Sequence, residues 1–359
     1  MIIEIILFIL GLILLVKGSD FFVKSAATLA KRLGISEFII GMTLVALGTS
    51  LPELASGIAA SLKQNSGLIL GNIVGSNLEN TGLIIGIGAI MMNGIRTKKK
   101  LMKRDGYIMV AVGILFLIFI INKTLGRWEA AIFLLIYCTY TIYLLQAKVP
   151  TREKEPFMDF IKYFFKLQYL TTIRSRVMTD IKHIEEGLNH TKKKVTKSEA
   201  KQITNLFTAS LIKDLLIMAI SGVAIYFGAK YLILEAVYFA NLLKVPTTLI
   251  GLTVVSLGTT LPELSVTISA ARKKYGGIII GNLLGSNITN ILLILGVSAM
   301  IHPLAVMKET LNIAVPLMVA MSILLMVLMR HKWELTRTNG ITLIGFYIIS
   351  LAIMFFTYV

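Results

Sequence analysis

Residues 41–54 read GMTLVALGTSLPEL, and residues 251–264 read GLTVVSLGTTLPEL, which is nearly the same sequence. A second pair of matching stretches follows at the same distance, GNIVGSNLEN at 71–80 and GNLLGSNITN at 281–290. All of these matches lie at one constant offset of 210 positions. A repeat at a fixed offset indicates an internal duplication, so each half of the chain is expected to fold as one copy of the same unit.

The composition is typical of a protein that crosses a membrane several times. Of the 359 residues, 56% are hydrophobic, and the mean hydropathy is +0.80. Soluble domains are only about 45–50% apolar. Many runs in this chain also reach the ~20 apolar residues that a helix needs to cross a bilayer. We therefore expect an all-α polytopic membrane protein.

Ten apolar segments can be drawn, five in each copy. Because five is odd, the second copy must enter the membrane in the opposite sense. The sequence thus predicts ten transmembrane helices as two inverted five-helix repeats, a plan of many secondary transporters, whose binding site lies near the midplane. The expected domains are a first five-helix repeat at 1–147, a basic loop at 148–208 and a second, inverted five-helix repeat at 209–359. The ten segments are 2–30, 35–62, 66–92, 106–122, 128–147, 209–240, 246–270, 277–301, 310–329 and 340–358.

The distribution of the net charge of +17 predicts the orientation in the cell membrane. Basic residues concentrate on the side that carries loop 148–208, and the positive-inside rule makes that side cytoplasmic and places both termini outside. Such loops favour contact with anionic lipid, and no nucleic-acid partner is expected. The other basic residues on this side are Lys31, Arg32, Arg96, Lys98, Lys99, Lys100, Lys103, Arg104, Arg272, Lys273, Lys274, Arg330, Lys332 and Arg337. The opposite side carries little more than Lys63, Lys123, Arg127, Lys244 and Lys308.

The first and sixth segments are longer than a bilayer requires, so we expect them to tilt. They align at the same offset of 210, with Gly18 matching Gly228. Their inner polar residues are expected to lie near the headgroups or to face protein, and a functional role is the alternative. These residues are Asp20, Lys24, Lys230 and Glu235.

Each copy of the first motif places a proline and a carboxylate inside an apolar run. Pro52 has no N–H group, so the carbonyl of Gly48 loses its helical hydrogen bond, and Pro262 has the same effect on Gly258. A membrane tolerates such a break only where protein or a water-filled cavity satisfies the freed groups. An ionisable residue at that depth indicates a functional site. Free carbonyls beside a carboxylate are hard oxygen ligands, which suit calcium and sodium.

Other polar residues share a helical face with the two glutamates. Positions 46, 49, 50 and 53 are spaced as i, i+3, i+4 and i+7, which places them on one side of a helix, and the second copy repeats the pattern. A lone Ser or Thr usually bonds back to its own helix and a lone Asn to a neighbouring helix, but the duplicated pattern favours one polar cluster. The four faces carry Ala46, Thr49, Ser50 and Glu53; Ser256, Thr259, Thr260 and Glu263; Ser76 and Asn80; and Ser286 and Asn290.

The motifs GTSLPE and GTTLPE, each followed by GNxxGSN, resemble the two α-repeats of the sodium/calcium exchangers, within the wider cation/calcium exchanger superfamily. The resemblance covers both halves and leaves out most of 148–208. It implies ten spans, calcium extrusion driven by sodium entry, and a transporter rather than an enzyme, with no cofactor besides the transported Ca²⁺ and Na⁺. It also implies ion sites built by the second, third, seventh and eighth spans. The implied ligands are Glu53 and Glu263 at the centre, the side chains of Thr49, Ser50, Ser76, Asn80, Thr259, Thr260, Ser286 and Asn290, and the backbone carbonyls of Ala46 and Ser256.

Two positions depart from the family pattern. Some relatives carry Asp at the position of Asn290, and an acid there is associated with the potassium-dependent branch, so asparagine favours potassium independence. Glu79 is unusual beside Asn80, and its counterpart at the offset of 210 is Thr289. Glu79 either reaches the edge of the site or pairs elsewhere.

Charge balance predicts how the two ions would share such a site. Two carboxylates offer two negative charges, which one calcium ion or two or more sodium ions neutralise. Both loads together would leave excess positive charge at low dielectric, where repulsion is severe. Occupancy should therefore be exclusive, and exclusive occupancy of a site that opens to alternate sides of the membrane is antiport.

Three other functions were weighed. A proton/calcium exchanger of the same superfamily is the main alternative, although that branch tends to carry a different motif around its acid. An intramembrane carboxylate hydrolase is more distant, because it requires two acids that share a proton and a water. An ion channel fits less well with strict duplication around a midplane acid. Calcium uptake under a sodium gradient or a pH gradient distinguishes the first two.

Overall fold

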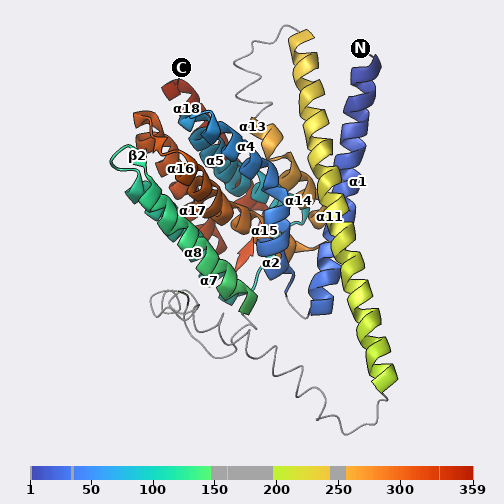
Figure 1. Ribbon diagram of the computed structural model, residues 1–359. Coiled ribbons are helices and arrows are strands. Elements are labelled where there is room, and N and C mark those ends of the chain that lie inside the picture. The colour runs from blue at the N-terminus through green and yellow to red at the C-terminus, as the bar shows by residue number, and fades with distance from the viewer. Residues whose placement is uncertain are drawn as a thin grey trace.

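The structure is a computed structural model, and it describes residues 2–33, 36–146, 160, 197–242, 256–330 and 332–358. Helices form most of this part of the chain and run between two ends of the molecule (Figure 1). The two marked termini lie at the same end. The expectation of a mostly helical protein is confirmed.

The first half begins with α1 (Ile2–Leu33), which extends along much of the molecule (Figure 1). Each break in the later helices falls in or next to one of the duplicated motifs. The further elements are α2 (Glu37–Ile40), η1 (Gly41–Val45), α3 (Ala46–Thr49), α4 (Leu51–Leu62), α5 (Ser66–Leu78), η2 (Glu79–Ile84), α6 (Ile85–Met91), β1 (Ile95–Arg96), α7 (Lys99–Phe119), β2 (Thr124–Leu125) and α8 (Arg127–Gln146), where η denotes a π-helical segment.

In the described residues of the second half, α14 matches α4 residue for residue at the offset of 210, whereas η5 has no counterpart in the first half. The helix α11 (Lys197–Leu242) begins earlier than expected, so the last part of loop 148–208 is helical. Most of that loop, at 147–159 and 161–196, lies outside the described residues. The elements that follow are α13 (Ser256–Thr259), α14 (Leu261–Arg272), α15 (Gly276–Thr289), η4 (Asn290–Leu295), α16 (Gly296–Ile301), β3 (Leu304–Ala305), η5 (Thr310–Ala314), α17 (Val315–Met329), β4 (Glu334–Leu335) and α18 (Arg337–Tyr358).

Several helices have the length and composition of membrane spans. In the described part of the chain, six helical segments are long and apolar enough to cross a bilayer. A seventh results if Glu37–Thr49 and Leu51–Leu62, which meet at a bend of 45°, are counted as one span. The six are Ile3–Lys31, Ser66–Met91, Ile212–Tyr231, Gly276–Ile301, Thr310–Met329 and Arg337–Thr357.

One predicted loop residue is placed differently by the structure. Arg104 was expected in a basic loop, but α7 begins at Lys99, and Arg104 lies inside this helix and is buried. Its guanidinium donates hydrogen bonds of 2.8 and 2.9 Å to the carboxylate of Asp105, which also accepts one of 3.0 Å from the hydroxyl of Tyr140. The buried charge is tolerated because a second charge and a hydroxyl satisfy it.

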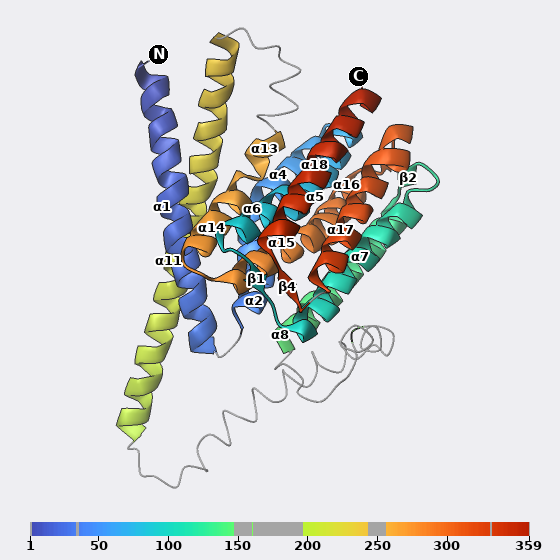
Figure 2. The ribbon, with the colours of Figure 1, turned by 180° about the vertical axis from the view of Figure 1, so that it is seen from behind.

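Two short antiparallel ladders tie the halves together. The strand β1 pairs with β4, and β2 pairs with β3. The two pairs lie towards opposite ends of the helices (Figures 1 and 2). Strands β2 and β4 occupy equivalent positions at the offset of 210, so equivalent connections of the two halves lie at opposite ends.

The long helices α1 and α11 pack along each other beside the other helices (Figures 1 and 2). A Cβ atom on Gly228 would lie 2.6 Å from the backbone nitrogen of Leu15, so this glycine permits close contact between the two backbones. The outer faces of both helices expose apolar side chains, as a lipid-facing pair requires.

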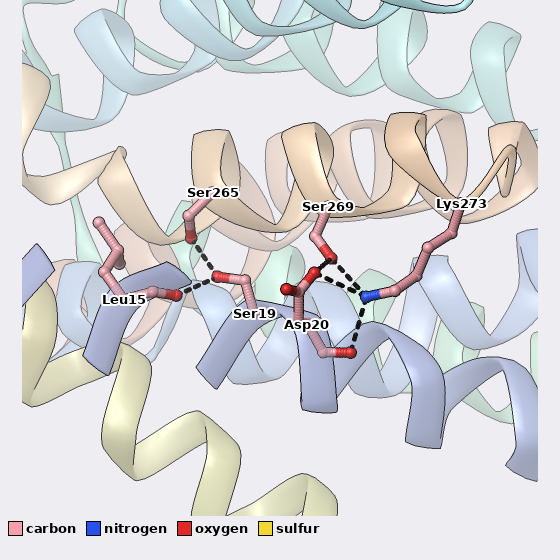
Figure 3. A network of polar contacts seen from close by, with 6 residues as sticks. All are labelled: Leu15, Ser19, Asp20, Ser265, Ser269 and Lys273. Atoms are coloured by element: carbon pink, nitrogen blue, oxygen red, sulfur yellow. Dashed lines mark hydrogen bonds and ion pairs between the residues drawn. The ribbon is translucent and has the colours of Figure 1, made fainter. Parts of the chain in front are cut away.

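A polar network attaches α1 to α14 (Figure 3). The Lys273 ammonium lies 2.7 Å from Asp20 Oδ1, and the Ser269 hydroxyl donates to the same oxygen at 2.7 Å. One turn away, the Ser19 hydroxyl donates to Ser265 Oγ at 2.7 Å. Asp20 therefore faces protein, which is one of the two placements expected for it.

Candidate ion-binding site

The two glutamates follow helix breaks of the same form. Ser50 separates α3 from α4 with φ −87° and ψ 6°, and Thr260 separates α13 from α14 with φ −92° and ψ 0°. A proline occupies the first turn after each break, where its missing N–H group is no loss. The interruption predicted from the prolines is present, and it places Glu53 and Glu263 in the first turns of α4 and α14. Exposed N–H groups at helix starts favour negative charge there.

Both carboxylates are buried, each with 1% of the residue exposed. The Ser50 hydroxyl donates to Glu263 Oε1 at 3.3 Å and its oxygen lies 3.1 Å from Ser286 Oγ, so residues from both halves meet at one point. Glu53 lies one turn further along the chain from Ser50, the residue whose hydroxyl contacts Glu263. The two predicted acids thus converge in the interior.

Two candidate threonines make equivalent contacts. The Thr49 hydroxyl donates to Asn282 Oδ1 at 3.2 Å, and the Thr259 hydroxyl donates to Asn72 Oδ1 at 3.1 Å. Both bonds join one half to the other. Asn72 and Asn282 were not among the predicted ligands, although each is the second residue of a copy of the GNxxGSN motif at the same offset, which was the available signal.

A network of amides lies beside the carboxylates. Asn80 Nδ2 donates to Asn287 Oδ1 at 3.1 Å, and Asn290 Nδ2 donates to Asn77 Oδ1 at 2.9 Å. Asn77 and Asn287 are again equivalent residues of the two motifs, and both were missed by the sequence analysis. The predicted asparagines are therefore held by their amide nitrogens.

Glu79 is a third buried carboxylate in this region. It accepts a hydrogen bond of 2.7 Å from the Thr260 hydroxyl and one of 3.3 Å from the Tyr347 hydroxyl. Of the two placements open to Glu79, the edge of the site is the one observed.

Several buried oxygens of the candidate residues accept no hydrogen bond. Such atoms are costly to bury unless a donor or a cation satisfies them. They are Glu53 Oε1 and Oε2, Glu263 Oε2, Asn80 Oδ1, Asn290 Oδ1 and Ser76 Oγ. Carboxylate and amide oxygens are the ligands that Ca²⁺ takes, six to eight at a time. The residues present therefore fit a hard cation.

The structure says less about two other expected ligands, the backbone carbonyls of Ala46 and Ser256. The backbone carbonyl of Ala46 accepts the Ser50 N–H at 3.0 Å and the Thr49 hydroxyl at 3.3 Å. Ser256 begins α13, and its side chain lies outside the described residues. Within the described part of the chain, no three acidic, histidine or cysteine side chains gather closely enough to hold a metal ion, so a bound cation would depend on neutral oxygens as well.

A mostly apolar cavity of about 690 Å³ lies next to the breaks. Thr49, Pro52 and Pro262 line it from the motifs, and Phe22 of α1 and Gly222 of α11 line it from the long helices. The cavity therefore reaches from the α1–α11 pair to a candidate ligand.

Comparison with known proteins identifies the family. The family model described as sodium/calcium exchanger protein matches residues 3–146 and again residues 213–356. This chain belongs to that family. The two matched ranges start and end at the offset of 210, so the duplication found in the sequence is a duplication of the sodium/calcium exchanger unit.

Individual relatives match this sodium/calcium exchanger along almost its whole length. The sodium/calcium exchanger MaX1 of Methanosarcina acetivorans is 43% identical over 351 residues, which cover 98% of each chain. The inner membrane protein YrbG of Escherichia coli K12 is 27% identical over 350 residues, covering 97% of this chain and 96% of YrbG. A solved structure of the sodium-calcium exchanger NCX_Mj, soaked with Na⁺ and Sr²⁺, superposes with a TM-score of 0.75 at 27% identity and covers 98% of each chain. The relatives named as exchangers are transporters, not enzymes.

Proposed function

We propose that this protein is a secondary antiporter that exchanges sodium for calcium across the cell membrane. The observation that carries the proposal is the set of buried oxygens without hydrogen-bond partners around Glu53 and Glu263. Family membership supports the same ions, because MaX1 is named a sodium/calcium exchanger.

The proposed ion site lies between the two helix breaks. Glu53 and Glu263 supply its charge, and neutral oxygens complete the coordination. The full proposed ligand set is Glu53, Glu263, Thr49, Ser50, Ser76, Asn80, Thr259, Thr260, Ser286 and Asn290, with the carbonyls of Ala46 and Ser256. No cofactor is required besides the transported ions.

The proposed topology is ten spans in two inverted five-helix repeats. The reversal of equivalent connections supports it, because β2 and β4 are equivalent in sequence and lie towards opposite ends. The loop at 148–208 would then be cytoplasmic, held near anionic lipid by its basic residues, and both termini would lie outside.

Exchange follows from charge balance at this site. One calcium ion or two or more sodium ions neutralise two carboxylates, and both loads together would repel one another at low dielectric. Each ion must therefore leave before the other binds. Sliding of α1 and α11 against the remaining helices is the proposed route to alternate openings, and the cavity that joins this pair to Thr49 supports it.

Substitution Asp20→Asn is expected to shift the equilibrium between the two access states towards the state in which α1 is not attached to α14. Asp20 and Lys273 attach α1 to α14, whereas their counterparts Lys230 and Lys63 are both basic and cannot form an ion pair. A partly exposed pair contributes about 1 kcal/mol or less, so we expect a shift of up to about fivefold in the ratio of the two states. Hydrogen exchange of α1 amides, with and without ions, measures this shift.

Arg96→Gln is the matched control for this experiment. It removes an ion pair of 2.9 Å with Glu334 that joins strands β1 and β4 and involves no residue of α1. Unchanged α1 exchange in both variants would mean that the Asp20 pair does not hold α1.

The direct test of the proposed function is calcium uptake into proteoliposomes. An outward sodium gradient is expected to drive calcium uptake, and a pH gradient without sodium is expected to leave uptake at background. The reverse result would identify a proton/calcium exchanger instead.

A further inference from the structure

The hydrogen bonds around the site break the symmetry between the two halves. Ser50 and Thr260 occupy equivalent positions at the two helix breaks. Ser50 donates to Glu263, at 3.3 Å, and lies 3.1 Å from Ser286. Thr260 instead donates to Glu79, at 2.7 Å. An equivalent pattern would have directed Thr260 towards the other glutamate of the pair.

Glu79 is what makes this difference possible. It begins η2, is buried, and also accepts a hydrogen bond from Tyr347 at 3.3 Å. Its counterpart in the second half is Thr289, which carries no charge. The second half therefore has no carboxylate at the position equivalent to Glu79 that could bind the Ser50 hydroxyl in the same way.

Because Thr260 bonds to Glu79 and not to Glu53, the part of the site around Glu53 has more oxygens without hydrogen-bond partners. Both carboxylate oxygens of Glu53 and the hydroxyl of Ser76 have no hydrogen-bond partner, whereas Glu263 Oε1 accepts a hydrogen bond from Ser50. Oxygens that accept no hydrogen bond are available to a cation without loss of an existing contact. Glu53 and Ser76 are thus expected to bind a cation more strongly than Glu263 does.

The charge of Glu79 adds to this effect. Its negative charge lies next to the site, because Glu79 accepts a hydrogen bond from the hydroxyl of Thr260, which is itself a proposed ligand. Glu79 can therefore act on a bound cation through its charge and through the position of Thr260.

We propose that Glu79 is a positioning residue that makes the two halves of the ion site unequal and sets the preference for calcium over sodium. It holds the Thr260 hydroxyl away from Glu53, and its negative charge, at the edge of the site and outside the pair of acids that the ions neutralise, attracts a bound cation. This inference rests on the proposed exchange of calcium and sodium.

The test is equilibrium binding of ⁴⁵Ca²⁺ to the purified full-length protein, with sodium as the competitor. Glu79→Gln removes the charge and keeps the size and a hydrogen-bond acceptor. Coulomb energy scales with the charge of the ion, so we expect calcium binding to weaken by roughly tenfold or more, and the constant per sodium ion by about the square root of that factor. Glu79→Thr, which introduces the residue found at the equivalent position, is expected to do the same.

Tyr347→Phe is the matched control, because it removes the other hydrogen bond to Glu79 and keeps the charge. Its calcium affinity should stay within about twofold of the unmodified protein. Unchanged calcium affinity in folded Glu79→Gln or Glu79→Thr protein would overturn the inference, as would equal factors for the two ions. Absence of saturable calcium binding in the unmodified protein would instead refute the proposed function.

Discussion

Substitution of Glu53 or Glu263 by glutamine is expected to abolish sodium-driven calcium flux. Each change removes one of the two charges that a calcium ion needs at a site where water is excluded. Removal of one partner from a buried charge pair typically costs about 3–5 kcal/mol, so we expect flux to fall by more than about a hundredfold, at roughly tenfold for each 1.4 kcal/mol. Uptake of ⁴⁵Ca²⁺ into proteoliposomes under a sodium gradient measures the effect.

Glu129→Gln provides the matched control. Glu129 lies in the first turn of α8, like the two site glutamates in their own helices, and it is not one of the proposed ligands. Its flux should remain within about twofold of the unmodified protein. Near-normal flux in either Glu53→Gln or Glu263→Gln would show that the two acids do not form the ion-binding site.

Substitution Gly281→Ala is expected to destabilise the protein and abolish ion binding with it. Gly281 lies in α15, which packs against α2, η1 and α3, and a methyl group there would collide with the backbone carbonyl of Phe38. Backbone cannot yield as a flexible side chain can, and overpacking typically costs about 1–3 kcal/mol or more. The same helix carries Asn282 and Ser286, so displaced backbone would move two residues of the site.

Thermal unfolding of the purified protein, followed with and without calcium, measures this effect. We expect a lower melting temperature and no stabilisation by calcium. Gly345→Ala is the control, because no described atom lies within 4 Å of the added Cβ. Equal melting temperatures for the two variants would mean that the close contact between Gly281 of α15 and the backbone of Phe38 does not stabilise the protein.

The main features of the site were predictable from local sequence. The duplicated motif located Glu53 and Glu263, and the prolines located the breaks at Ser50 and Thr260. The predicted breaks are present because a missing N–H group acts within one turn of helix.

The partners of these residues were not predictable in the same way. Glu79 is bonded to Thr260 and Tyr347, which lie 181 and 268 positions away in the chain. Asn282 was missed because its role depends on Thr49, in the other half. The spacing of residues along one helix carries no information about which residues of a second helix contact the first.

Arg104 illustrates a wrong prediction with a physical cause. Positive charge indicates a loop only where no counter-charge is at hand, and Asp105, which also accepts a hydrogen bond from Tyr140, supplies one inside the protein. The limits of helices were also shifted where charged residues extend an apolar run, as at the start of α7 and α11.

The most direct test of a shared ion seat is calcium binding to the unmodified protein at increasing sodium concentration. If one pair of acids serves both ions in turn, sodium will raise the apparent Kd for calcium without limit, leave the amount bound at saturating calcium unchanged, and act with a slope above one. Calcium that stays bound at saturating sodium, with the two ions present together, would contradict exclusive occupancy of the site between Glu53 and Glu263.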